Sequence, residues 1–186
     1  ISPIVEIIRS AQPQSVLDIG IGFGKFGFLC REYLELWDGR NKYGDWQKRI
    51  DGIEAFPQYV TPLQKQIYDN IYVGDAREIV PNLTHYYDLI LMIDVIEHFT
   101  LADGHRLLHN SAKHSRGLLI STPLTVSAQE DSFGNPFEIH KSQWTPDQFS
   151  AFAEKVFFPN PHALVCYLRF DGVKVQAAPA KPPVAV

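Results

Sequence analysis

The chain has 186 residues, of which 45% are hydrophobic and 20% are charged. This is the composition of a globular protein, and it excludes a disordered, collagen-like or heptad-dominated chain. The length favours a single domain that buries its own core. Lys and Arg number 17 against 21 Asp and Glu, which gives a net charge of −4. Because proteins that depend on phosphate contacts usually carry a basic excess, nucleic acid is disfavoured as a partner.

Membranes and oxidising compartments are also disfavoured. No apolar run approaches the ~18 uninterrupted residues that a membrane helix needs, so we expect no membrane partner. The chain has only two cysteines, Cys30 and Cys166. They are too few for a disulfide framework or a four-thiolate metal site, which favours a reducing, cytoplasmic setting.

Strand-like and helix-like segments alternate along the chain. In chain order, the apolar patterns and the positions of Pro and Gly predict a helix that begins at Ser2 and Pro3, a strand over residues 15–20, a helix over 26–37, a strand over 49–54, a helix from Pro57, a strand over 70–73, a helix over 76–83, a strand over 87–94, a helix over 101–114 and a strand over 117–121. The strand over residues 87–94 is the most apolar of them.

The last third of the chain has a different pattern. Residues 124–144 show no periodicity and are longer than an ordinary connection, and loops of this length tend to be functional. A further helix is expected to begin at Thr145. Residues 163–170 and 173–177 flank Asp171-Gly172, which is a strong hairpin signal. We expect one domain over residues 1–178 and a frayed, Pro/Ala-rich tail over residues 179–186.

This alternation predicts a doubly wound α/β fold. We expect a mainly parallel, seven-stranded sheet with helices on both faces and a C-terminal antiparallel β-hairpin. In such sheets, ligands bind at the carboxyl ends of the strands. Four of the first five predicted strands end in residues suited to ligand chemistry, namely Gly20, Glu54, Asp75 and Asp94.

A glycine-rich run lies between the first predicted strand and the helix that follows it. Residues 18–24 read Asp-Ile-Gly-Ile-Gly-Phe-Gly, and such glycines let the backbone turn tightly and let a ligand lie against bare main chain. Gly22 to Gly27 also fits the dinucleotide pattern G-x-G-x-x-G. That pattern calls for an acid about 20 residues further on, whereas Glu54 follows Gly24 by 30 residues. The turn-rich insert over residues 38–48 can explain the excess.

The whole run and three later segments suggest a second interpretation. Residues 16–24 resemble the first motif of class I S-adenosylmethionine (SAM)-dependent methyltransferases, and Glu54 falls where that family has an acid at the end of the second strand. Gly74-Asp75-Ala76 resembles a later motif, and residues 87–98 resemble the fourth-strand motif of the small-molecule enzymes. The resemblance implies that Glu54 binds the ribose hydroxyls and that Asp75 meets the adenine amino group. Asp75 can also cap the helix that follows it. The implied cofactor site consists of Asp18, Gly20, Gly22, Gly24, Glu54, Asp75, Ala76 and Asp94, with Asp18 either touching SAM or supporting the glycine turn.

The chemistry of the cofactor favours SAM over a dinucleotide. SAM has a sulfonium cation, a ribose diol and an adenine but no phosphate, so its site needs hydrogen-bond acceptors more than cations. A diol can donate both hydroxyl protons to one carboxylate, in charge-assisted bonds. The predicted rim is acidic and interrupted only by Lys25, and a pyrophosphate would lie poorly among so many carboxylates.

The methyl acceptor also needs a group that takes its proton. A histidine suits this role because its ordinary pKa is about 6.5. We predict that His140, in the long segment after the fifth strand, is the base, and that His98 or Glu97, after the fourth strand, assists it. His105 and His109 lie four apart on a predicted helix, but no third ligand is evident, so no metal site is predicted.

The sequence therefore predicts an enzyme that moves a methyl group from SAM to a small-molecule acceptor. The expected acceptor atom is an oxygen of a glycosyl or phenol-like compound. Two alternatives stay open: an NAD(P)-dependent oxidoreductase, and a non-catalytic Rossmann-like interaction module. The acidic rim argues against the module, because a protein without a ligand has little reason to keep desolvated carboxylates around a glycine turn.

Overall fold

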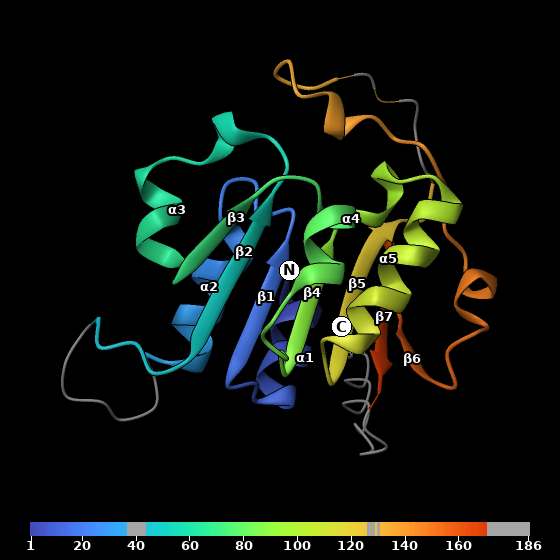
Figure 1. The fold of residues 1–186 in the computed structure, drawn as a ribbon. Coiled ribbons are helices and arrows are strands. Elements are labelled where there is room, and N and C mark those ends of the chain that lie inside the picture. Colours follow the sequence, from blue (N-terminus) through green and yellow to red (C-terminus); the bar gives the residue numbers. More distant parts are fainter. Residues whose placement is uncertain (37–43, 126–128, 130, 171–186) are drawn as a thin grey trace, which may run out of the picture.

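The protein is built on one mixed sheet, seen in a computed structural model that describes residues 1–36, 44–125, 129 and 131–170. The sheet has seven strands in the order β3-β2-β1-β4-β5-β7-β6 (Figure 1). The strands are β1 (Ser15–Ile19), β2 (Arg49–Glu54), β3 (Asn70–Val73), β4 (Leu89–Ile93), β5 (Gly117–Pro123), β6 (Glu154–Phe158) and β7 (Ala163–Arg169). Strands β1 to β5 pair in parallel, and β7 pairs antiparallel with both β5 and β6.

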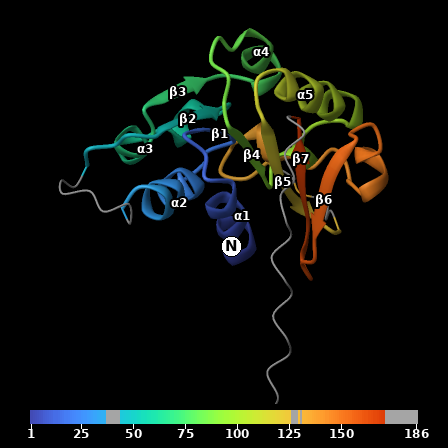
Figure 2. The same cartoon turned by 90° about the horizontal axis from the view of Figure 1, so that it is seen from below.

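Helices cover both faces of this sheet. The α-helices are α1 (Ser2–Ala11), α2 (Lys25–Leu34), α3 (Pro62–Ile67), α4 (Ala76–Ile79) and α5 (Leu101–Lys113). Short 3-10 helices join them: η1 (Pro57–Tyr59), η2 (Val80–Asn82), η3 (Ile96–His98), η4 (Pro136–Glu138) and η5 (Pro146–Phe149). Figure 2 shows α1, α2 and α3 on one side of the sheet and α4 and α5 on the other.

The core has two layers because side chains alternate across each strand. In β1, Val16 packs into the cluster beneath α1 and α2, whereas Leu17 and Ile19 pack into the cluster beneath α5. All three are at most 1% exposed, and burying an aliphatic side chain of this size stabilises a fold by about 1.5–3 kcal/mol. The alternation also decides where Asp18, between Leu17 and Ile19, directs its carboxylate.

The predicted fold class is confirmed, but the antiparallel pairing uses a different strand. The strand expected over residues 163–170 exists as β7. Its hairpin partner is β6, a strand that was not predicted. Strand β6 is short and half-exposed, and it directly follows the segment where a helix was expected at Thr145; that helix is the single 3-10 turn η5. The strand predicted over residues 173–177, the domain end at 178 and the tail lie outside the described residues.

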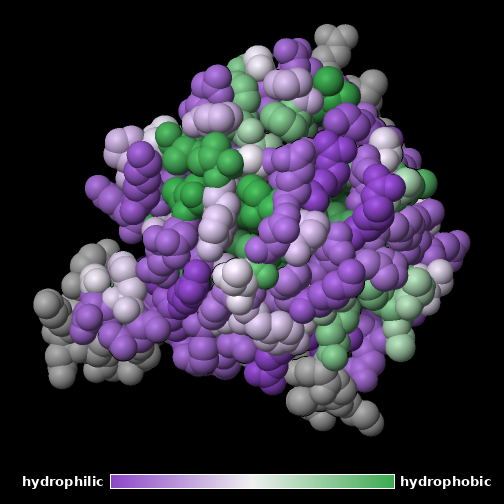
Figure 3. All heavy atoms as spheres, viewed as in Figure 1, coloured by the Kyte–Doolittle hydropathy of each residue, from purple (hydrophilic) through white to green (hydrophobic). Residues whose placement is uncertain are grey.

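Helix length and surface character bear on contact with a membrane. None of the helices in the described part of the chain has the length and apolar character needed to cross a bilayer. The face in Figure 3 is mostly hydrophilic, and apolar side chains gather in its upper half, toward the carboxyl ends of the parallel strands.

Candidate active site

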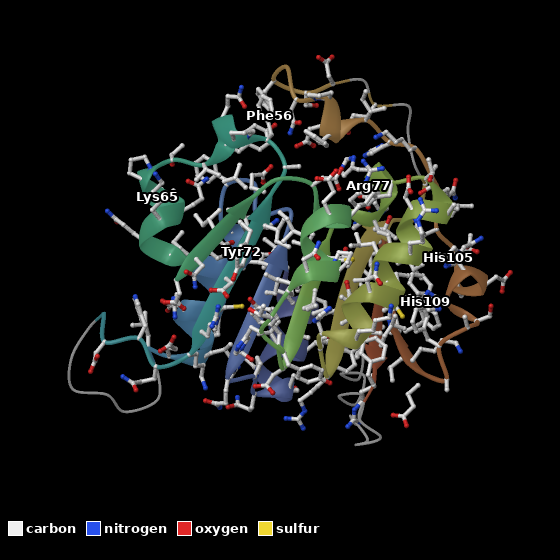
Figure 4. The ribbon with its side chains drawn as sticks, viewed as in Figure 1. Phe56, Lys65, Tyr72, Arg77, His105 and His109 are labelled. Atoms are coloured by element: carbon white, nitrogen blue, oxygen red, sulfur yellow. The ribbon has the colours of Figure 1, made fainter. Side chains whose placement is uncertain are left out.

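A pocket opens at the carboxyl ends of the parallel strands, where the sequence predicted a ligand site. It is lined by seven of the predicted residues: Gly20, Gly22, Glu54, Asp75, Ala76, Asp94 and His98. The segment that carries η4 crosses above this edge of the sheet (Figure 1). In Figure 4, Arg77 lies at this edge, whereas His105 and His109 lie further down α5 and away from it.

Two glycines form the floor of the pocket, and the turn allows no other residue there without strain. Gly20 and Gly22 have φ angles of 75° and 47°, in the left-handed region. A Cβ added to Gly20 would lie 2.6 Å from Val95 Cγ2, whereas a Cβ added to Gly22 would meet no atom within 4 Å. The backbone at Gly22 is therefore open to a ligand. Gly24 caps α2 and faces α3 instead of the pocket.

Asp18 lies behind the glycine turn and does not line the pocket. It is 2% exposed, and its Oδ2 accepts a hydrogen bond of 2.6 Å from the Tyr68 hydroxyl. The same hydroxyl accepts a bond of 3.2 Å from Gly27 N–H. Burial raises the pKa of Asp18 to about 7, even though the bond from Tyr68 lowers it. Of the two roles expected for Asp18, the structure places it for supporting the turn.

Glu54 joins the end of β2 to the glycine turn. Its Oε2 accepts from Gly22 N–H at 2.9 Å and its Oε1 accepts from Phe56 N–H at 2.9 Å. A carboxylate has about four acceptor positions, so Glu54 keeps acceptor capacity for a ligand. Burial raises the pKa of Glu54 although the two backbone bonds lower it. Glu54 therefore presents a largely desolvated carboxylate to the pocket.

Asp75 has both a capping role and a place in the pocket. Its Oδ1 accepts from Arg77 N–H at 2.8 Å and caps α4. The Arg77 guanidinium forms an ion pair with the same carboxylate, with Nη2 2.6 Å from Oδ2. Burial opposes ionisation of Asp75, but the hydrogen bonds from Arg77 outweigh it and lower its pKa. The capping role is confirmed, and an adenine amino group would have to share the carboxylate with Arg77.

Asp94 lines the pocket in an uncommon backbone conformation. Its φ is 57°, which a residue other than glycine rarely adopts and which clusters at functional sites. Its N–H donates to the Ser121 carbonyl at 2.8 Å, and its Oδ1 accepts from Ser121 Oγ at 3.0 Å. These two bonds hold the turn after β4 against the end of β5.

The structure brings the three predicted catalytic residues together. The rings of His98 and His140 lie 5.1 Å apart, and a carboxylate oxygen of Glu97 lies within 4.8 Å of a nitrogen of each. Only His98 of the three lines the pocket. Burial lowers the pKa of His98, whereas burial and the charge of Asp94 raise the pKa of Glu97 to about 7. The group can accept a proton or hold a cation.

The segment with His140 is fixed to η3 and α5. Lys141 N–H and Ser142 N–H both donate to the Glu97 carbonyl, at 2.8 and 3.1 Å. Trp144 is 1% exposed, and its indole N–H donates to Ser142 Oγ at 2.9 Å. Its ring packs on α5 at Gly104, where a Cβ would collide with it. These contacts hold the backbone that directly follows His140.

The helix pair excluded as a metal site has a packing role. The rings of His105 and His109 lie 5.0 Å from Trp144 and 5.1 Å from Phe152. They cover the outer side of this aromatic cluster.

Several pocket residues were not predicted. They come from the turns after β2 and β3 and from the long segment: Ala55, Tyr59, Arg77, Asn135, Glu138 and Lys141. The position of Arg77, two residues after a strand-end Asp, was a usable signal. The other side chains carry no motif of their own, although the lack of periodicity over residues 124–144 indicated that the segment has a function.

The fold is that of class I SAM-dependent methyltransferases. One similar structure is a protein of Nostoc punctiforme assigned as an O-methyltransferase, with a TM-score of 0.64 and 16% identity over 90% of this chain; the chain spans only 56% of that protein. The N-terminal domain of EvdMO1, with S-adenosylhomocysteine (SAH) bound, has a TM-score of 0.61 and 14% identity over 89% of this chain and 80% of its own.

A third structure is CalS10 of Micromonospora echinaspora, an amino pentose methyltransferase with SAM bound. Its TM-score is 0.61, with 13% identity over 90% of this chain and 89% of its own. No family model and no curated protein sequence matches the chain.

Proposed function

We propose that the protein transfers a methyl group from SAM to an oxygen of a small glycosyl or phenol-like acceptor. The observation that carries this proposal is the hydrogen bond from Gly22 N–H to Glu54, which brings open backbone and a desolvated carboxylate together in one pocket. The fold supports it, as do the SAH and SAM bound in similar structures.

In this proposal, each strand end has a role toward SAM. Glu54 accepts from the ribose hydroxyls, and Gly20 and Gly22 let the cofactor lie on the main chain. Ala76 and the carboxylate of Asp75 border the adenine. Asp94 borders the methionine part or the acceptor. Gly24 and Asp18 hold the turn in shape from outside the pocket.

The pocket suits SAM better than a nicotinamide dinucleotide. Four carboxylates line it, those of Glu54, Asp75, Asp94 and Glu138, against two cations, Lys141 and an Arg77 guanidinium that is already paired with Asp75. A pyrophosphate would meet more negative charge than positive charge there. This arrangement favours methyl transfer over the oxidoreductase alternative.

The reaction needs only an in-line displacement. The acceptor oxygen forms a bond to the methyl carbon while the bond between that carbon and sulfur breaks, and its electron pair stays on sulfur to leave SAH. Orienting the two reactants can supply roughly 7–11 kcal/mol of the barrier in the best cases. We assign removal of the hydroxyl proton to the group formed by Glu97, His98 and His140.

The proposed acceptor is a sugar or a phenol because aromatic side chains surround the pocket. Tyr59, Phe99 and Phe137 line it and can stack on a flat ring or on the apolar face of a sugar. The structure of the N-terminal domain of EvdMO1 was determined in the presence of D-fucose, and CalS10 is an amino pentose methyltransferase. We propose neither nucleic acid nor a membrane as a partner. A cytoplasmic location fits the two free, buried cysteines.

Isothermal titration with SAH and NAD⁺ tests the cofactor. We expect SAH to bind and Glu54→Gln to weaken it at least tenfold, because one oxygen that accepts from the diol becomes an amide donor. Glu78→Gln, on an exposed part of α4, is the matched control and should bind as the unchanged protein does. Tight binding of NAD⁺ without binding of SAH would overturn the proposal.

Transfer of labelled methyl from SAM to a panel of glycosides and phenols tests the acceptor. Incorporation should require a free hydroxyl and fail on the matching O-methylated compound. Transfer confined to amine acceptors would overturn the oxygen assignment.

A further inference from the structure

Glu97, His98 and His140 form a potential set of metal ligands that spans two distant segments. Each offers one ligand atom, and the three atoms lie within 4.8 Å of one another. Glu97 and His98 belong to η3, while His140 lies in the segment after β5. The set combines one carboxylate and two imidazoles, which suits first-row divalent ions.

The spacing is close to what one ion requires. Metal–ligand distances for imidazole and carboxylate are about 2.1 Å, so two ligands on opposite sides of an ion lie about 4.2 Å apart. The three ligand atoms here all lie within 4.8 Å of one another, so no pair exceeds that span by more than roughly half an ångström. Binding one ion would require the side chains to bring these atoms closer together.

The Glu97 carboxylate has an unmet need for a partner. Glu97 is 1% exposed, and among the described residues neither its Oε2 nor the buried Thr122 hydroxyl makes a hydrogen bond of good geometry, although that hydroxyl lies near enough to lower the pKa of Glu97. Buried polar atoms nearly always have a partner, and an exception calls for an explanation such as an ion. A cation between Glu97 and the two imidazoles would satisfy this oxygen.

His98 is oriented as a metal-binding histidine usually is. Its Nδ1 lies 3.3 Å from the Ile139 carbonyl. If Nδ1 carries the proton and donates it there, Nε2 keeps its lone pair for an ion, and a bond of this kind to a carbonyl is the common second contact of metal-bound histidines. Because Glu97 accepts backbone bonds from Lys141 and Ser142, both halves of the set are held together before any ion binds.

We propose that Glu97, His98 and His140 bind one divalent first-row metal ion, such as Mn²⁺ or Co²⁺, at the edge of the pocket. Three protein ligands leave coordination positions open, and His98 connects the ion to the pocket lining. The role that follows rests on the proposed methyl transfer: the acceptor hydroxyl occupies an open position on the ion.

A metal ion would change how the hydroxyl loses its proton. Bound to a divalent cation, an oxygen becomes more acidic, as water does on zinc. The proton passes to solvent water, and the metal-bound oxygen then forms the bond to the methyl carbon as the carbon–sulfur bond breaks. No electron is gained or lost by the metal. His98 and His140 are then ligands, and neither acts as the base.

Binding of Mn²⁺ to chelator-treated protein tests the site directly, without knowledge of the acceptor. We expect titration calorimetry to show one ion per chain and the electron paramagnetic resonance signal of free Mn²⁺ to fall accordingly. Glu97→Gln and His140→Ala should each weaken binding at least about tenfold. His109→Ala, on the exposed side of α5, is the matched control and should bind as the unchanged protein does.

Folding and function are separated by parallel measurements. Each variant is also tested for its melting temperature and its SAH affinity, and His140→Ala is the decisive one because contacts of other residues hold the backbone that directly follows it. If neither Mn²⁺, Co²⁺ nor Zn²⁺ binds the unchanged protein, or if folded His140→Ala binds as tightly, the metal site is overturned. SAH binding without metal binding would leave methyl transfer standing with His140 as the base. Metal binding without SAH binding would support the site and overturn methyl transfer.

Discussion

The two sides of the pocket are held in place in different ways. The glycine side (Gly20, Gly22 and Glu54) lies directly at the ends of paired, buried strands. The histidine side (Glu97, His98 and His140) combines a 3-10 turn with a long segment that a few hydrogen bonds attach to it. The contrast teaches that changes on the glycine side should alter stability and cofactor binding together. Changes on the histidine side should alter the chemistry alone.

His140→Ala should give the largest separation between the two sides. We expect turnover to fall by about 10²–10⁴-fold, because the hydroxyl loses the group that activates it. SAH affinity, measured by calorimetry, should stay within error of the unchanged protein. His162→Ala, at an exposed loop position, is the control. An equal loss of turnover and SAH affinity would show that the segment had collapsed.

Asp18→Asn should show that the stability of the glycine side depends on pH. Folded Asp18 keeps its proton up to about pH 7, while the unfolded chain releases it near the ordinary value of 3.8. The stability that this group contributes is therefore complete below about pH 4 and is lost as pH rises through 7. It amounts to up to about 4 kcal/mol. Asn does not titrate, so the melting temperature of the variant should rise relative to the unchanged protein between pH 4 and 7. A difference that does not vary with pH would contradict this prediction.

Two alanine substitutions in the glycine turn should have different consequences. Gly20→Ala places a methyl against Val95 in a left-handed conformation and should cost about 2–3 kcal/mol of unfolding free energy. Gly22→Ala has the backbone strain alone, at about 1–2 kcal/mol, but its methyl enters open space beside the pocket. Chemical denaturation with SAH calorimetry should find the greater stability loss in Gly20→Ala. Gly22→Ala should lose more SAH affinity than Gly20→Ala, relative to the unfolding free energy that each variant loses. If Gly20→Ala lost more SAH affinity on this scale, the proposed cofactor position would be contradicted.

Arg77→Met should have the smallest effect. The partly exposed ion pair with Asp75 is worth less than about 1 kcal/mol of stability. Its loss frees the Asp75 carboxylate for an amino group, so we expect SAH to bind more tightly, by less than about tenfold. Weaker SAH binding would show that Arg77 itself touches the cofactor.

What the sequence predicts well is local. Gly20, Glu54 and Asp75 were found because each ends an apolar strand, and parallel strands bring their ends to one edge. Asp18 was the ambiguous residue of this group. The alternation of side chains in β1 puts it on the same face as Val16, beneath α2, and that signal was present in the sequence.

What the sequence predicts poorly depends on contacts between distant segments. The bonds from Lys141 and Ser142 to the Glu97 carbonyl join residues more than 40 positions apart, and no pattern marks them. They bring together three residues that were predicted to share one catalytic role, and the prediction that there is no metal site considered the two cysteines and the helix pair but not this group. Strand β6 was not predicted although it ends in the strand-favouring Val156, Phe157 and Phe158, because its apolar run is short and its pairing with β7 involves residues further along the chain.

Gly104 has a consequence that reaches well beyond its own helix. Glycine in a helix interior costs about 1 kcal/mol relative to alanine, yet here it admits the indole of Trp144, four residues after His140. A bulkier residue at position 104 would push the indole of Trp144 outward. The segment that carries His140 would move with it. Random mutagenesis for activity should therefore find inactivating changes at Gly104 in α5, which is buried and does not line the pocket.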